Sequence, residues 1–478
     1  FTINLVESPD IPTVGVGEAT IPPIIQLLQF LEINEADLLS KISGTFKFGI
    51  HFENWSNIGD SYMHAFGPLG TNFQNLTFTE AWLKCKHQLN LPPLNNFSST
   101  AVASYNSKFS HCWAKPKDAQ NSHYFPLSNL FHAYQFDAAL LADYLKEYAI
   151  KRGVNFISDT VANVYQDNNG NVEKLALKNF GLLTGDYFVD CSGARSTINK
   201  QTLKSEFTSW KKYLPCDSAL VVQTKATESP LPYTKSIAMD SGWRWQIPLQ
   251  MRNGNGYVYA SDFTSFEEVE KEFEKALAGQ TKINEPRTIK FETGCLSKPW
   301  DKNCIAIGLS SGFLEPLEST SIHMTHKFAI KLMGCFKHGT DMQKEADDFN
   351  HAFRTDSIAI RDFLILHYTA TKREDSAFWR HCKNIEKPEA LQNYLSQYQE
   401  TGHISLPKDN IFPYESWLQV LVGQNYLTDY SRFRDESIDF KQAGVFFNNV
   451  EKAINSEVSR LIDHKSYLTD YLSQVRNS

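Results

Sequence analysis

The sequence predicts a mixed α/β fold that passes into a mostly helical region toward its C-terminal end. Before Ile322, short apolar runs are separated by glycines and polar turns, a pattern typical of strands. After Ile322 the apolar spacing becomes helical, over 324–336, 341–368, 387–399, 414–421 and 439–472. We therefore expect one domain over 1–330 that contains the sheets and a second, helical domain over 331–478.

The composition is that of an ordered globular protein and argues against several kinds of partner. Hydrophobic residues make up 42% and aromatic residues 13% of the 478 residues, enough for a large core and aromatic-lined pockets. A net charge of -7 without a basic block argues against nucleic acid, and no apolar run approaches the roughly 18 residues of a membrane span. The 8 cysteines are scattered without a C-x-x-C pair, which argues against a zinc site and disulfides and favours a reducing cytoplasm.

The first residues predict a strand that ends in an acid, Glu7, and is broken by Ser8-Pro9-Asp10. In dinucleotide-binding folds an acid at the end of the second strand binds the adenosine ribose, about 20 residues after a Gly-x-Gly-x-x-Gly turn. No such turn occurs at the right place, so we expect the first strand and its glycine turn to lie before Phe1. Taken alone, Glu7 is more readily explained as a surface acid.

A glycine-containing segment follows over 14–23. Gly15 and Gly17 allow an unusual backbone path and a close approach to a ligand, although a simple loop explains them as well. Residues 24–39 then predict one amphipathic helix.

Residues 44–55 alternate strictly and predict a single strand. Phe46, Phe48, Ile50 and Phe52 would face one side, and Lys47 and His51 the other, about 13 Å apart along the strand. A solvent-facing side is the simple explanation. The aromatic and histidine-containing run that follows, Tyr62 to Gly67, favours a pocket wall instead.

The middle of the chain predicts further strands, turns and helices. We expect an irregular loop over 91–120, a helix over 136–152, a strand from 154, a hairpin turn at 168–171, a strand opening into a small-residue turn over 187–195, and a helix over 266–277. Within 241–248, Trp243 and Trp245 lie on one strand face, where two indoles would form either a rigid wall or an aromatic core stripe. Residues 257–260 predict its antiparallel neighbour.

The run from Gly308 to His323 combines a glycine- and serine-rich turn with two carboxylates, between a short strand at 304–307 and the helix at 324–336. Backbone N–H groups at such a turn can hold an anion, and a carboxylate beside them can act as a base or stabilise a developing cation. The simpler explanation is a helix start capped by Ser319 or Thr320.

Together these runs resemble the flavin-dependent halogenases, in particular the tryptophan halogenase branch. The resemblance is carried, in matching order, by Glu7-Ser8-Pro9-Asp10, Gly15 to Pro22, Phe46-Lys47, Phe52 to Trp55, Asp190 to Gly193, Gly242 to Pro248 and Phe313 to Thr320. It implies an FAD-binding, Rossmann-like box domain of hydroxylase type with an antiparallel sheet over 1–330, in which 45–120 contributes to the substrate pocket. The helical part would lie on the substrate side.

The resemblance also implies a two-component reaction. A separate flavin reductase supplies FADH2, and oxygen with a halide ion (chloride, bromide or iodide) yields hypohalous acid, which reaches the aromatic substrate through a tunnel. Lys47 would hold the oxidant or be halogenated by it, and Glu318 would stabilise or deprotonate the cationic ring.

Further residues receive roles from the resemblance. FAD would be contacted by Glu7, Gly15, Val16, Gly17, Ala19, Gly308, Leu309, Ser319 and Ile322, and halide by Ser319, Thr320 and Ser321. The substrate would be contacted by His64, Phe66, Trp243, Trp245 and Trp417, with the two strand indoles keeping it away from the flavin. No metal site is expected.

The sequence departs from this family at two places. Ser321 stands where a glycine is common, and the C-terminal aromatic clusters that clamp free tryptophan are not recognisable around 411–426, where Trp417 is the nearest candidate. We therefore expect another electron-rich acceptor, of indole or phenol type. A single-component FAD hydroxylase of the same fold and a non-catalytic flavin-binding protein remain alternatives, and a homo-oligomer is left open.

Overall fold

The computed structural model describes residues 1–11, 17–114, 124–337, 340–427 and 429–476. The largest sheet has seven strands in the order β17-β13-β16-β15-β14-β4-β5, and all neighbours are antiparallel except β14 and β4. Its strands are β17 (Arg287–Lys290), β13 (Ser218–Lys225), β16 (Arg252–Tyr259), β15 (Gly242–Pro248), β14 (Thr234–Met239), β4 (Gly49–Glu53) and β5 (Ser61–Ala65). The predicted pairing of the indole strand with its neighbour is confirmed by the antiparallel ladder between β15 and β16.

The strand predicted over 44–55 is divided between two sheets. β3 (Thr45–Lys47) pairs with β6 (Ala133–Asp137), which also pairs with β2 (Gly17–Ala19), whereas β4 belongs to the large sheet. The chain bends at Phe48, whose N–H donates to the carbonyl of Pro232. The expectation that Lys47 and His51 share one face was therefore wrong, because alternation along the sequence does not reveal a change of sheet.

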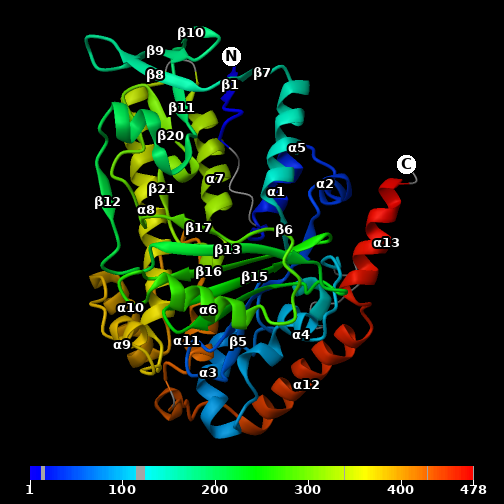
Figure 1. Cartoon of the computed structure of the whole chain (residues 1–478). Coiled ribbons are helices and arrows are strands. Elements are labelled where there is room, and N and C mark those ends of the chain that lie inside the picture. The colour runs from blue at the N-terminus through cyan, green and yellow to red at the C-terminus, as the bar shows by residue number, and fades with distance from the viewer. Residues whose placement is uncertain (12–16, 115–123, 338–339, 428, 477–478) are drawn as a thin grey trace.

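Four smaller strand groups complete the β structure. β1 (Asn4–Glu7) and β7 (Asn155–Ser158) are parallel, as are β11 (Phe188–Asp190) and β20 (Cys304–Ala306), and β19 (Trp300–Asp301) is antiparallel to β20. The hairpin predicted at 168–171 joins β8 (Val161–Gln166) to β9 (Val172–Leu177), and with β10 (Gly181–Thr184) it projects at the top of the molecule (Figure 1). β12 (Phe207–Ser209), β18 (Gly294–Leu296) and β21 (Gly312–Phe313) form the last group.

Thirteen α-helices are assigned within the described residues. They are α1 (Ile24–Phe30), α2 (Glu35–Lys41), α3 (Phe78–Leu89), α4 (Ser99–Tyr105), α5 (Ala138–Lys151), α6 (Phe266–Ala276), α7 (Ser321–Cys335), α8 (Met342–Thr369), α9 (Ala377–Lys383), α10 (Glu389–Thr401), α11 (Tyr414–Gly423), α12 (Phe440–Ser459) and α13 (His464–Arg476). Helix α12 runs along the bottom of the molecule and α13 rises on its right side to the C-terminus (Figure 1).

Two of the helix predictions and one loop prediction had wrong boundaries. The helix expected over 24–39 is divided into α1 and α2, because Glu32 adopts a left-handed backbone with φ of 55°. The helix expected over 439–472 is divided into α12 and α13, and the loop expected over 91–120 contains α4. Short polar caps set the starts of several other helices, as Asp137 does for α5 by accepting from the N–H groups of Ala139 and Leu140.

One hydrophobic core draws on both predicted domains. It extends from Ala19 through Phe46 and Trp243 to residues of the C-terminal helices such as Trp417 and Leu472. The division at residue 330 into an FAD-binding domain and a substrate-side domain therefore remains a proposal. No helix in the described part of the chain combines the length and the apolarity that crossing a bilayer requires.

Candidate active site

Lys47 is a fully buried cation on the short strand β3. Its Nζ donates to the Oγ of Ser319 at 2.8 Å and to the carbonyl of Thr20 at 3.1 Å, and it lies 5.3 Å from the ring centroid of Phe66. Both hydrogen-bond partners of this amine are thus neutral groups. An ammonium group without a directly bonded carboxylate loses its hydration on burial.

Burial shifts the ionisation of this amine. It lowers the pKa of Lys47 to about 7, although the carboxylates of Glu318 and Glu18 favour the charged form. Glu18, two residues before Thr20, has its pKa raised to about 7 by burial, against the attraction of Lys47. Near neutral pH, Lys47 can therefore offer either an N–H donor or a free lone pair.

Glu318 lies between two histidines that the intervening sequence separates widely. Its Oε2 is 2.8 Å from Nδ1 of His64 on β5, and its Oε1 is 2.8 Å from Nε2 of His367 near the end of α8. Nδ1 of His367 lies 2.8 Å from the carbonyl of Phe363, so that nitrogen carries a proton.

These partners keep the carboxylate charged in a dry environment. Burial alone would raise the pKa of Glu318, but His64 and His367 outweigh it and lower this pKa to about 2. The carboxyl group is only 1% exposed. A buried charge with this support can oppose positive charge that develops on a nearby ring.

The turn between Glu318 and α7 joins the two sides of the site. Ser319 adopts a left-handed backbone with φ of 57°, and its hydroxyl accepts from Lys47. No side chain caps α7 at Thr320, so the first N–H groups of this 15-residue helix have no side-chain partner. Ser321 begins the helix itself, and the left-handed position of the turn is Ser319.

The two predicted wall indoles are neighbours on β15, but they are not stacked. The rings of Trp243 and Trp245 are 6.1 Å apart at an interplanar angle of 55°. Trp243 Nε1 donates to Oε2 of Glu315 at 2.8 Å, and the hydroxyl of Tyr368 donates to the same oxygen at 2.5 Å. Burial raises the pKa of Glu315 to about 7 in spite of these donors.

The remaining substrate residues do not all lie together. His64 bonds to Glu318, and Phe66 lies beside Lys47, so both belong to the site. Trp417 on α11 is buried and packs edge-on against Phe363, with ring centroids 5.2 Å apart.

Three of the predicted flavin residues lie in the turn after β20 or at the start of α7. Gly308 has a left-handed φ of 72° in the turn after β20, and the next residue, Leu309, is 40% exposed. Ile322 is half-buried in the first turn of α7, beside the uncapped helix start. Leu309, Ile322 and the uncapped start of α7 are the groups that would hold the flat ring of FAD. The Glu7 carboxylate at the end of β1 would bind a ribose hydroxyl, and it also contacts Lys146 at 3.2 Å.

The flavin residues predicted within 14–23 differ in what the structure shows of them. Gly15 and Val16 lie outside the described residues. At Gly17 the close approach is to the protein itself, because an added Cβ would lie 3.3 Å from Cα of Gly254 on β16. Ala19 is buried beside Gly17 on β2.

Sequence reasoning missed three groups that shape the site. They are the carbonyl of Thr20, the imidazole of His367 and the imidazole of His464. The last accepts from the N–H of Phe46 at 3.3 Å through Nε2, while its Nδ1 donates to the carbonyl of Pro230 at 2.8 Å. None has a local sequence signal, since each acts on a residue more than 20 positions away.

Known proteins with related sequences place this arrangement in a family. The family model described as tryptophan halogenase matches residues 1–437. Tryptophan 6-halogenase SttH from Streptomyces toxytricini is 32% identical over 444 residues, which cover 88% of this chain and 84% of that protein. Tryptophan 7-halogenase RebH from Lentzea aerocolonigenes is 31% identical over 85% of this chain and 78% of its own length.

Solved structures agree over nearly the whole chain. Xcc4156, a flavin-dependent halogenase from Xanthomonas campestris, aligns with a TM-score of 0.91 at 33% identity over 98% of this chain and 93% of that one. BrvH, a flavin-dependent halogenase from Brevundimonas, aligns with a TM-score of 0.89 at 32% identity over the same shares. The chain therefore belongs to the tryptophan halogenase family of flavin-dependent halogenases, which are enzymes that use FAD and halide to halogenate aromatic substrates.

Proposed function

We propose that this chain is a two-component, FADH2-dependent halogenase whose chemical step on the arene occurs at Lys47 and Glu318. One observation carries the proposal: the ammonium of Lys47 bonds at 2.8 Å to Ser319, the residue that directly follows Glu318. One turn thereby connects the buried amine, the buried carboxylate and the uncapped start of α7. A flavin reductase supplies FADH2 from outside the chain.

Each residue has a physical role in this scheme. Bound FADH2 supplies, with oxygen and halide, the hypohalous oxidant. The free N–H groups at the start of α7 and the hydroxyl of Thr320 hold the halide, and Ser319 stays bonded to Lys47. Lys47 donates a hydrogen bond to the oxidant from Nζ and orients its halogen toward the ring. Glu318 offsets positive charge on that ring and accepts the proton it loses.

The acceptor we propose is a free, electron-rich arene of indole or phenol type. Trp417, the nearest candidate for a tryptophan clamp, is buried and packed against Phe363. An indole committed to the core in this way is not available to stack on a ligand. This supports an acceptor other than free tryptophan, as the divergent segment around it also suggests.

The test is a product screen with supplied FADH2, oxygen, and chloride, bromide or iodide over a panel of indoles and phenols, read by mass spectrometry. We expect one halogen to be added, with a bromide or chloride isotope pattern. A hydroxylated product formed with NADPH by the chain alone would favour the single-component hydroxylase. Bound flavin without any halogenated arene across the panel would favour a non-catalytic flavin protein.

A further inference from the structure

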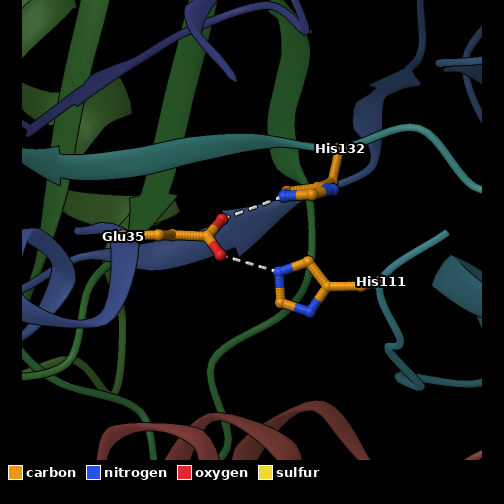
Figure 2. Close-up of side chains that lie close together, drawn as sticks. All are labelled: Glu35, His111 and His132. Atoms are coloured by element: carbon orange, nitrogen blue, oxygen red, sulfur yellow. Dashed lines mark hydrogen bonds and ion pairs between the residues drawn. The ribbon is translucent and has the colours of Figure 1, made fainter. Parts of the chain in front are cut away.

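We propose that Glu35, His111 and His132 form a binding site for one divalent transition metal ion such as Zn²⁺. Glu35 begins α2, His111 lies in the segment after α4, and His132 directly precedes β6. Figure 2 shows both imidazoles directed at the two oxygens of the carboxylate, and one potential ligand atom from each residue lies within 4.8 Å of the others. No metal site was expected from the sequence, and the scattered cysteines argued against zinc, but that argument concerns thiolate ligands, whereas this donor set is the His₂Glu of many zinc enzymes.

The distances match ligands that share one ion. Nε2 of His111 lies 2.9 Å from Oε2 of Glu35, and Nε2 of His132 lies 3.1 Å from Oε1. Zinc bonds of about 2.0–2.1 Å place neighbouring ligand atoms about 2.9 Å apart at right angles and about 3.4 Å apart in a tetrahedron. A carboxylate between two nitrogens at these separations can bind an ion with one or both of its oxygens.

The ligands also have the outer partners that metal sites need. Tyr134 on β6 donates to Oε1 of Glu35, and Tyr471 on α13 donates to Oε2 at 2.6 Å. The hydroxyl of Tyr467 lies 2.6 Å from Nδ1 of His111. Such contacts fix the rotamer and tautomer of ligating side chains, and they come here from two separate elements, β6 and α13.

The same contacts describe a hydrogen-bonded cluster without metal, so the two states must be compared. Without an ion, each Nε2–H donates to Glu35, and the Tyr467 hydroxyl donates to Nδ1 of His111. With an ion, both Nε2 atoms become ligands and the proton on His111 moves to Nδ1, where Tyr467 accepts it. Tyr467 can take either role, which preserves the outer contact.

The site lies beside the strand that carries Lys47. Ala133, the neighbour of His132, pairs with Lys47 in the ladder between β6 and β3. The ring of Phe46 lies 5.1 Å from that of His111 and 5.6 Å from that of His132, both edge-on. An ion bound there would stiffen the backbone that holds Lys47, and the partial exposure of His111, 28%, leaves room for a water ligand.

The test is direct metal titration of the full-length, tag-free protein after dialysis against EDTA. We expect one Co²⁺ per chain with visible absorption bands from nitrogen and carboxylate ligation, displacement of Co²⁺ by Zn²⁺, and a melting temperature that rises with added Zn²⁺. Metal analysis of the protein as purified should find up to one zinc ion per chain. No cobalt band at a tenfold excess of Co²⁺ would overturn the proposal and leave a hydrogen-bonded cluster.

Two conservative variants and one control make the assignment specific. Glu35→Gln and His132→Gln keep polar groups of similar size and should each weaken Co²⁺ binding at least 100-fold. His351→Ala, an exposed histidine on α8, should bind Co²⁺ like the wild type. Unchanged stoichiometry and affinity in both cluster variants would overturn the site even if the wild type binds metal, and far-UV circular dichroism confirms that each variant is folded.

Discussion

Replacing His367 with phenylalanine tests the buried pair at the centre of the proposed site. The ring size is nearly kept, but the ring nitrogen that lies 2.8 Å from Oε1 of Glu318 is lost. Lowering the pKa of Glu318 from 4.5 to about 2 corresponds to about 3 kcal/mol of net stabilisation, to which His64 and His367 both contribute. Removing one partner of a buried pair typically costs about 3–5 kcal/mol. We expect His367→Phe to lose about 2–4 kcal/mol of unfolding free energy at pH 7.

The effect should depend on pH with a defined sign. Because the folded pKa of Glu318 lies below the unfolded value, its stabilisation is fully present above about pH 4.5 and is lost as the pH falls toward 2. The contribution at pH 3 is less than half of that at pH 7, so wild type and variant should converge on acidification.

The assay is urea unfolding followed by tryptophan fluorescence, within a double-mutant cycle that includes Glu318→Gln. The two substitutions should couple by about 2 kcal/mol, because either one alone leaves a buried group without its partner. His351→Phe on the same helix is the matched control for changes in helix propensity. A loss below about 1 kcal/mol at pH 7, or strict additivity in the cycle, would refute the buried pair.

Three further substitutions probe the surroundings of the site. Lys47→Ala should abolish arene halogenation while hypohalous acid still forms, measured with a small-molecule halogen acceptor; loss of the oxidant itself would contradict separate sites. His464→Ala removes the acceptor of the Phe46 N–H beside Lys47, and should lower kcat at least tenfold with little change in flavin affinity; full activity would show that β3 needs no such support. Trp243→Phe leaves a buried oxygen of Glu315 with one donor fewer. It should therefore lower the free energy of unfolding in urea by about 1–3 kcal/mol. A loss below about 0.5 kcal/mol would argue against this hydrogen bond.

Local patterns predicted most elements and the proposed chemical residues. The hairpin at 168–171, the ladder that contains Trp243, and the helices after Ile322 follow from turn chemistry and side-chain periodicity, which are properties of neighbouring residues. Lys47 and Glu318 were found because their runs resemble a family, and the structure brings both of them into one buried cluster.

Long-range contacts decided what local patterns could not. The change of sheet at Phe48 reversed the expected relation of Lys47 to His51, and Glu32 broke a helix that periodicity continued. Periodicity describes which side of an element is apolar and contains no information about which element packs against it.

The sequence by itself therefore determined which elements and chemical groups the chain contains. It is an α/β chain with an acid-ended strand, two indoles on one strand, a lysine within a strand and a carboxylate-rich turn. Only the tertiary structure decided the ionisation of that lysine and carboxylate. Lys47 has a pKa of about 7 because folding strips it of water, and Glu318 stays charged because His64 and His367 converge on it from β5 and α8. Burial and convergence of distant groups set these pKa values, and neither exists before the chain folds.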